Sequence, residues 1–352
     1  MTLEEIREQI RPLHEASMEQ AKRHWMQIAK PLFSLGKLED AVIQMAGILE
    51  TPDYELKKKA LVIMCADNGI VAEGVTQTGQ EVTAMVADNF TRSRTSICSM
   101  SKVAGVELFP VDVGMVSDVP SVTCREEKVA YGTRNFLEEP AMTREEVWQA
   151  IELGIRKVRE FKEQGYEIVA TGEMGIGNTT TSSAVASVLL SVPPEQVTGR
   201  GAGLSSKGLE RKVSVIRSAL EKQQPQTEDP VDVLSKVGGL DIAGLTGVFL
   251  GGALYRIPIV IDGFISSVAA LCAVRMVPLS KGYMIPSHVS KEPAGAMVLK
   301  ELGLSPFLTC DMSLGEGSGA VAVIPLLEMG LSVYREMTTF EQTEIEQYEV
   351  LP

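Results

Sequence analysis

The 352-residue chain has the composition of an ordinary α/β protein, with 45% apolar residues, 5% aromatic residues and 31 glycines. A formal net charge of −13 argues against a general nucleic-acid-binding surface, so an anionic ligand would need a local basic group. Five cysteines and 3 histidines are scattered singly, so we expect the cysteines to be reduced thiols and do not expect a structural or catalytic zinc site. The acidic N-terminus lacks a signal-peptide pattern and no apolar stretch has membrane-spanning length, so we expect a cytoplasmic protein without a membrane partner.

The first part of the chain is expected to be helical. Residues 2–29 carry apolar side chains at helical spacing, a pattern that Pro31 ends, and a second helix follows up to Leu49. Since no strand is expected here, the segment should pack as a small helical layer.

From residue 60 the pattern changes to short apolar strands that alternate with longer helical stretches. This pattern predicts a mostly parallel, doubly wound (Rossmann-like) α/β sheet with flanking helices. Strands are expected at residues 61–66, 106–111, 166–171 and 257–261. Pro110 disfavours the second of them, because proline cannot donate a hydrogen bond to a neighbouring strand.

The connections between these strands differ in character. A capping box at Thr143 starts an amphipathic helix up to Gly165. Residues 122–140 show no periodicity and predict a loop near the site, either a lid or a plain connection. Small residues at nearly helical spacing predict close helix packing at Gly244, Gly247, Gly251 and Gly252.

An acid close to a glycine marks the end of each predicted strand, at Asp67, Asp112, Glu173 and Asp262. Ligands of a doubly wound sheet bind outside the carboxyl ends of its strands, so these acids would share the ligand-binding edge. Aspartate and glycine also favour helix caps and turns, and for the three aspartates both interpretations stay open.

The stretch from Gly172 to Ala184 predicts a strand end, a glycine-rich turn and the start of a helix. Free N–H groups at such a helix start suit a phosphate. The stretch has no P-loop lysine, and Thr180 stands where a dinucleotide motif requires its third glycine. A turn without ligand is the alternative, but Glu173 argues against it, because a carboxylate beside a phosphate is unfavourable unless it takes part in chemistry.

Two further segments could complete a site. A second glycine-rich turn at residues 198–204 precedes a helix with Lys207, Arg211 and Lys212, which could be a solvated face or could supply one cation to a phosphate. Glu316 stands among small residues before an apolar stretch. Its carboxylate could bond to the backbone of a tight turn, or could face a ligand with a raised pKa.

Motifs in order along nearly the whole chain resemble one family, the nicotinate-nucleotide:dimethylbenzimidazole phosphoribosyltransferases. The matching segments are 34–39, 64–69, 73–75, 111–114, 172–175, 178–180, 232–239, 285–288 and 314–320. The resemblance implies a large α/β domain at 56–290 and a small helical domain from both chain ends, 1–55 and 291–352, in a homodimer. It implies transfer of the 5-phosphoribosyl group from nicotinate mononucleotide to a benzimidazole, with inversion at the anomeric carbon and without metal or cofactor.

The resemblance also assigns roles to individual residues. Glu316 would take the proton from the benzimidazole, and Glu173 would stabilise positive charge on the ribose or assist proton removal. The residues expected to bind phosphate and ribose are Gly175, Gly177, Asn178, Thr179, Thr180, Gly201 and Lys212. Those expected to bind the base are Thr78, Val86, Met174 and Leu314.

Two of the base-binding positions depart from the family pattern. Thr78 lies where the family commonly has serine, and Val86 lies where some members have glutamine, which leaves the preferred acceptor open. Alternatives are a transferase of the same fold that prefers another base or a phenol, and a non-catalytic nucleotide or benzimidazole sensor. The paired acids Glu173 and Glu316 argue against the sensor, and the missing P-loop lysine and magnesium site argue against a kinase.

Overall fold

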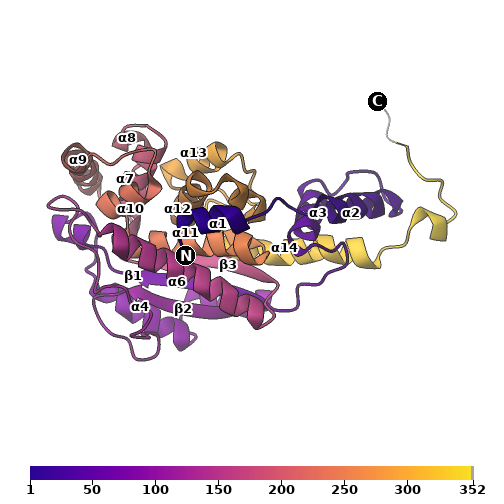
Figure 1. Cartoon of the computed structure of the whole chain (residues 1–352), viewed down its shortest axis with the longest axis horizontal. Coiled ribbons are helices and arrows are strands. Elements are labelled where there is room, and N and C mark those ends of the chain that lie inside the picture. The colour runs from indigo at the N-terminus through magenta and orange to yellow at the C-terminus, as the bar shows by residue number, and fades with distance from the viewer. Residues whose placement is uncertain (350–352) are drawn as a thin grey trace.

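The computed structural model describes residues 1–349, which form a five-stranded parallel sheet flanked by helices (Figure 1). Its strands are β1 (Lys59–Ala66), β2 (Glu107–Gly114), β3 (Ile168–Met174), β4 (Ile259–Ile261) and β5 (Met284–Pro286). The strand order is β2-β1-β3-β4-β5 and each neighbouring pair is parallel, which confirms the predicted fold class. The order reverses between β1 and β3, and ligands of such sheets bind near this point.

Strand β1 is buried along its whole length, as expected for a central strand covered on both faces. Its alternate side chains enter two separate cores, Val62 and Met64 on one face and Leu61 and Ile63 on the other. Pro110 is tolerated because β2 is an edge strand with β1 as its one neighbour. The three-residue strand β5 was not predicted, because so short a segment carries no periodicity of its own.

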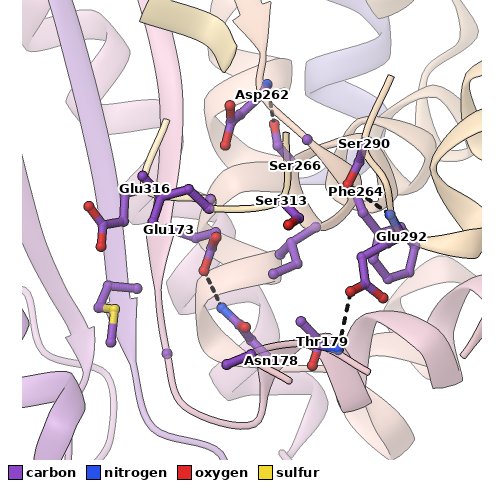
Figure 2. A pocket seen from close by; sticks show the side chains of 18 of the residues that line it. Glu173, Asn178, Thr179, Asp262, Phe264, Ser266, Ser290, Glu292, Ser313 and Glu316 are labelled. Carbon is purple, nitrogen blue, oxygen red and sulfur yellow. Dashed lines mark hydrogen bonds between the residues drawn. The ribbon is translucent and has the colours of Figure 1, made fainter. Parts of the chain in front are cut away.

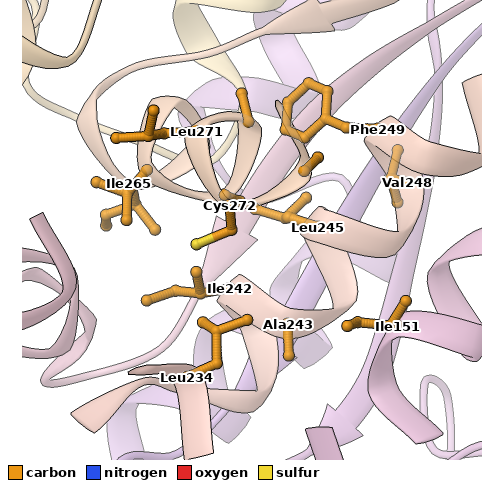
Figure 3. Packing of buried hydrophobic residues seen from close by; sticks show 14 of the residues in the cluster. Ile151, Leu234, Ile242, Ala243, Leu245, Val248, Phe249, Ile265, Leu271 and Cys272 are labelled. Atoms are coloured by element: carbon orange, nitrogen blue, oxygen red, sulfur yellow. The ribbon is translucent and has the colours of Figure 1, made fainter. Parts of the chain in front are cut away.

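One face of the sheet is covered by α6 (Arg144–Glu163), α11 (Leu240–Tyr255) and α12 (Phe264–Met276). Figure 3 shows apolar side chains of α11 between Ile151 of α6 and Cys272 of α12. The helices approach so closely that a Cβ atom on Gly247 would lie 2.0 Å from the carbonyl oxygen of Ile151. Gly247 and Gly251 therefore serve close helix packing against α6, as predicted, whereas Gly244 and Gly252 face side chains of β1 and β4.

The opposite face is covered by α4 (Glu81–Thr91), α5 (Ser96–Ala104) and α14 (Ser318–Glu336), together with part of α3 (Lys37–Leu49). The capping box at Thr143 is formed as predicted and starts α6. The remaining helices are α7 (Asn178–Leu189), α8 (Pro194–Val197), α9 (Ser206–Gln223), α10 (Pro230–Val237) and α13 (Pro293–Leu302), with 3₁₀ turns η1 (Gly69–Glu73), η2 (Pro278–Tyr283) and η3 (Phe340–Gln342).

The N-terminal segment forms two helices where one continuous pattern was predicted, α1 (Leu3–Gln9) and α2 (Glu15–Gln27). Pro12 lies between them and cannot continue a helix that began upstream. Helix α1 packs on the sheet-bearing body, where Arg7 Nε donates to the carbonyl oxygen of Met276 at 3.0 Å.

Helices α2 and α3 instead lie beside the C-terminal half of α14 and protrude from one side of the body (Figure 1). His24 Nε2 donates to the carbonyl oxygen of Tyr334 at 2.8 Å, which joins the two ends of the chain. The domain boundaries at residues 55/56 and 290/291 stay predictions.

Residues 122–140 contain neither helix nor strand. Lys128 in this loop pairs with the buried carboxylate of Asp112 at 3.2 Å, which fixes the loop over the end of β2. The loop supplies no residue to the cavity described below. Within residues 1–349 no helix is long and apolar enough to cross a membrane.

Candidate active site

A cavity of about 240 Å³ lies outside the carboxyl ends of β3, β4 and β5 (Figure 2). Its walls come from segments that are distant in sequence. They are Val86 of α4, the end of β3 with the turn after it and the start of α7, residues 201–202, residues 262–266 after β4, residues 288–292 after β5, and residues 313–316 before α14. Figure 2 shows Glu173 and Glu316 on one side of the cavity and Thr179 and Glu292 on the other.

Glu173 is the second-last residue of β3 and is almost fully buried. Asn178 donates from Nδ2 to the Glu173 carboxylate and also to Oδ2 of Asp241, the latter at 3.0 Å. Burial, followed by the negative charge of Asp241, raises the pKa of Glu173 to about 8. Burial raises the pKa of Asp241 to about 6. The Glu173 carboxyl therefore holds a proton more readily than an exposed glutamate does.

The Glu316 loop has an unusual backbone, because Gly315, Glu316 and Gly317 all have left-handed φ angles of 78°, 60° and 90°. This conformation is unfavourable for glutamate and is usually held by its surroundings at functional sites. The loop rests directly on β3, and a Cβ atom on Gly172 would lie 2.7 Å from the carbonyl oxygen of Glu316. The glycine before Glu173 thus allows the two acidic segments to meet.

Asp262 holds this loop in place. Its carboxylate accepts hydrogen bonds from the N–H groups of Gly317 at 3.1 Å, Gly319 at 2.7 Å and Ala320 at 3.1 Å. These N–H groups belong to the start of α14, whose orphan donors need acceptors. The sequence left two interpretations open for Asp262, a helix cap or a ligand-binding residue. Its hydrogen bonds are those of a helix cap, and they join the end of β4 to the start of α14.

The other two strand-end aspartates also bind backbone turns. Asp67 accepts the N–H of Val116 at 2.8 Å, and Asp112 accepts the N–H of Met115 at 2.8 Å. Neither residue lines the cavity. Both are therefore turn formers at the sheet edge.

The Glu316 side chain lines the cavity and forms no ion pair within residues 1–349. Burial and the nearby charge of Asp262 raise its pKa. Its Oε2 atom is buried and has no hydrogen-bond partner within residues 1–349. A partly desolvated carboxylate with a free oxygen has the affinity for protons that a general base needs.

Lys212 on α9 lies on the opposite side, behind Thr179. Its side chain is fully buried, and Nζ donates to Oγ1 of Thr179 at 2.9 Å and to the carbonyl oxygen of Gly199 at 3.2 Å. Burial lowers the pKa of Lys212 to about 8, and the charge of Glu292 acts against this effect. Within the described chain no carboxylate lies within ion-pair distance of Nζ, so the buried ammonium favours a bound anion.

The other basic residues of this helix take different directions. Lys207 is exposed, and Arg211 donates to the carbonyl oxygen of Glu73. The sequence left open which of these three basic residues would bind a phosphate. Of the three, Lys212 contacts the glycine-rich turn at residues 198–204, through the carbonyl oxygen of Gly199.

The remaining residues expected to bind phosphate and ribose gather at the start of α7. Gly175, Asn178, Thr179 and Gly201 line the cavity. Gly177, with a φ of 96°, lines a smaller adjoining cavity of about 90 Å³. Thr180 is fully buried and lines neither cavity.

The residues expected to bind the base are less closely grouped. Val86, Met174 and Leu314 line the main cavity. Thr78 lines the adjoining cavity, next to Gly177 and Arg200. The structure therefore brings three of the four base-binding candidates to the main cavity and places the fourth beside it.

A family model described as phosphoribosyltransferase matches residues 10–345. The chain belongs to this family. It is 45% identical over 351 residues to the nicotinate-nucleotide–dimethylbenzimidazole phosphoribosyltransferase of Clostridium acetobutylicum, covering 100% of both chains. It is 47% identical over 337 residues to the protein of the same name from Acetivibrio thermocellus, covering 96% of both. These matches confirm the resemblance seen in the sequence motifs.

A solved structure supports the same assignment of the fold. The crystal structure of CobT from Thermus thermophilus superposes with a TM-score of 0.89 at 36% identity, and the match covers 95% of this chain and 100% of that one. This phosphoribosyltransferase therefore shares its fold with that protein over 95% of its length.

Several cavity residues of this phosphoribosyltransferase were missed by sequence reasoning. His288, Ser290, Glu292 and Ser313 line the cavity. Asp241, at the start of α11, lies behind Asn178. His288 belongs to the family-like motif 285–288, but nothing in the residues of that motif assigned a role to it. No group of three or more His, Cys, Asp or Glu side chains in the described part of the chain is spaced to hold a metal ion.

Proposed function

We propose that this phosphoribosyltransferase moves the 5-phosphoribosyl group of nicotinate mononucleotide to 5,6-dimethylbenzimidazole. The products are nicotinate and α-ribazole 5′-phosphate, with inversion at the anomeric carbon, for the lower ligand of cobalamin. The observation that carries the proposal is one cavity with the unneutralised Glu316 carboxylate on one side and the buried Lys212 behind the opposite wall. The names of the Clostridium and Acetivibrio relatives support it.

Glu316 acts as the general base in this proposal. One benzimidazole nitrogen attacks C1′ of the ribose, and the bond from C1′ to the nicotinate nitrogen breaks. Nicotinate leaves with that electron pair, and its ring loses the pyridinium charge. The N–H proton on the other benzimidazole nitrogen passes to Glu316, which avoids a cationic product in a closed cavity. The raised pKa of Glu316 matches this task.

Glu173 stabilises the positive charge that develops on the ribose. Burial and the charge of Asp241 raise its pKa and favour the protonated form. The pyridinium charge of the bound nucleotide favours the ionised form, because a nearby cation lowers a carboxyl pKa. The resulting carboxylate then faces an oxocarbenium-like centre, as in glycosyl transfer by paired carboxylates.

The 5′-phosphate binds at the start of α7 and the turn before α9. Donors on this side are the N–H group of Gly201, the Thr179 hydroxyl and, through Thr179, the Lys212 ammonium. The flat base lies against Val86, Met174 and Leu314, whose apolar side chains suit a benzimidazole ring.

We further propose that two copies of the chain associate through α5 and α14. A groove of about 440 Å³ between these helices is lined by apolar residues including Met100, Val103 and Pro325. The side chain of Val103 is 88% exposed, which favours burial against a second copy. Light scattering of Val103→Glu should give a monomer mass where the wild-type chain gives a dimer mass; a wild-type monomer refutes the proposal.

The function is tested by incubating purified protein with nicotinate mononucleotide and 5,6-dimethylbenzimidazole without added metal. Chromatography should show nicotinate and α-ribazole 5′-phosphate in equal amounts. If neither product forms, a panel of other benzimidazoles, adenine and phenols separates a different acceptor preference from the absence of transferase activity. Absence of nicotinate release with every acceptor would refute the proposed reaction.

A further inference from the structure

The turn before α9 already holds a carboxylate from within the chain. Glu292 directly precedes α13, and its Oε1 accepts the N–H of Gly201 at 3.1 Å (Figure 2). Its Oε2 is buried and has no hydrogen-bond partner within residues 1–349. This oxygen is pressed against the turn, since a Cβ atom on Gly199 would lie 1.8 Å from it.

The surroundings of this carboxylate are those of an anion site. Gly201 has a φ of 53°, which turns its N–H toward Glu292. A Cβ atom on Gly201 would lie 2.8 Å from Oγ1 of Thr179, which in turn accepts from Lys212 at 2.9 Å. The charge of Glu292 stabilises the Lys212 ammonium, yet it lies beyond ion-pair distance. The positive charge of Lys212 is thus only partly neutralised.

We propose that Glu292 is an internal competitor for the substrate's phosphate and thereby sets the affinity for the nucleotide. The carboxylate occupies the Gly199–Gly201 turn while the cavity is empty and leaves it when a phosphate binds. The proposal rests on the proposed function, which places the phosphate at Gly201 and Lys212.

The exchange follows from charge and donor number. One Gly201 N–H cannot serve a carboxylate and a phosphate at the same time, and two anions at this distance repel. A phosphate dianion neutralises Lys212 more fully than the displaced carboxylate does. Glu292 is partly exposed as a residue, so its side chain can turn toward solvent. Since both substrate and product carry the 5′-phosphate, return of Glu292 also assists product release.

The competing explanation is that Glu292 accepts hydrogen bonds from the ribose hydroxyls. Inorganic phosphate separates the two explanations, because it has no ribose. Glu292→Gln keeps the shape and an oxygen for the Gly201 N–H but removes the charge. Glu301→Gln is the matched control, since Glu301 lies on α13, the helix that follows Glu292. Its side chain is exposed and pairs with Arg275 of α12, outside the cavity.

Calorimetry should show that Glu292→Gln binds inorganic phosphate about tenfold more tightly than the wild-type protein, the effect of removing one like charge from nearby. Nicotinate mononucleotide should bind more tightly as well, and product release should slow. Glu301→Gln should match the wild-type protein. Glu292→Asp, with its carboxylate drawn back by one methylene, should fall between them.

Unchanged or weaker phosphate binding by Glu292→Gln would overturn the proposal, as would no phosphate binding by either protein. Weaker nucleotide binding with unchanged phosphate binding would assign Glu292 to the ribose instead. The wild-type nicotinate-release assay reports on the proposed function separately, so a failed competition and a failed function give different results.

Discussion

Replacing Asp262 by alanine removes the acceptor of three backbone N–H groups at the Glu316 loop. Hydrogen bonds to a charged group contribute about 1.5–3 kcal/mol each. Water from the main cavity, which Asp262 lines, can enter the space left by the carboxylate and recover part of this free energy. We therefore expect the free energy of unfolding to fall by about 2–4 kcal/mol.

The effect on catalysis has a separate cause. Without Asp262 the left-handed backbone at Glu316 is no longer held, and a displacement of about 1 Å at a reacting group can cost about 10²-fold in rate. We expect kcat/KM to fall by about that factor. The pKa of Glu316 should also fall, because the charge of Asp262 is one of the two causes that raise it.

The assay combines urea unfolding with steady-state kinetics for both substrates. Asp112→Asn is the control, because Asp112 also binds a turn N–H at a strand end but lies outside the cavity lining. It should lose stability and keep kcat/KM. A folded Asp262→Ala protein whose kcat/KM stays within about threefold of wild type would refute the positioning role.

Three further predictions concern the proposed active site. Glu316→Gln should keep the Kd for nicotinate mononucleotide and lower kcat by about 10²–10⁴, the usual contribution of a general base; near-full activity would exclude that role. Lys212→Ala should raise the KM for the nucleotide about tenfold with a smaller change in kcat, whereas an unchanged KM would mean that the backbone alone holds the phosphate. Burial and, after it, the charge of Asp241 raise the pKa of Glu173; Asp241→Asn removes the second cause, so the rising limb of the pH–rate profile should move to lower pH. A limb that does not move would contradict the coupling between these two acids.

Much of the fold and part of the site could be predicted because the signals are local. The apolar stretch of β1 and the capping box of α6 each lie within one element, and both are formed as predicted. The glycine-rich stretches around Glu173 and Glu316 mark turns because glycine permits a backbone that other residues resist. The prediction of one continuous helical pattern at the N-terminus was wrong for a related reason. The apolar spacing continues across Pro12, but α1 ends before this proline and α2 begins after it.

By itself the sequence determined four of the five strands, the helix that follows the capping box at Thr143, and which acids stand at glycine-rich turns, because these depend on neighbours along the chain. Only the tertiary structure decided how these residues act on one another. Lys207 and Lys212 belong to the same helix, and burial behind Thr179 alone distinguishes the second. Asp262 and Ala320 are 58 residues apart and meet because the Glu316 loop, which leads into α14, rests on β3 next to the end of β4. The hydrogen-bond partners and the pKa of a carboxylate depend on the residues that surround it in the fold, and the sequence next to the carboxylate does not predict which residues these are.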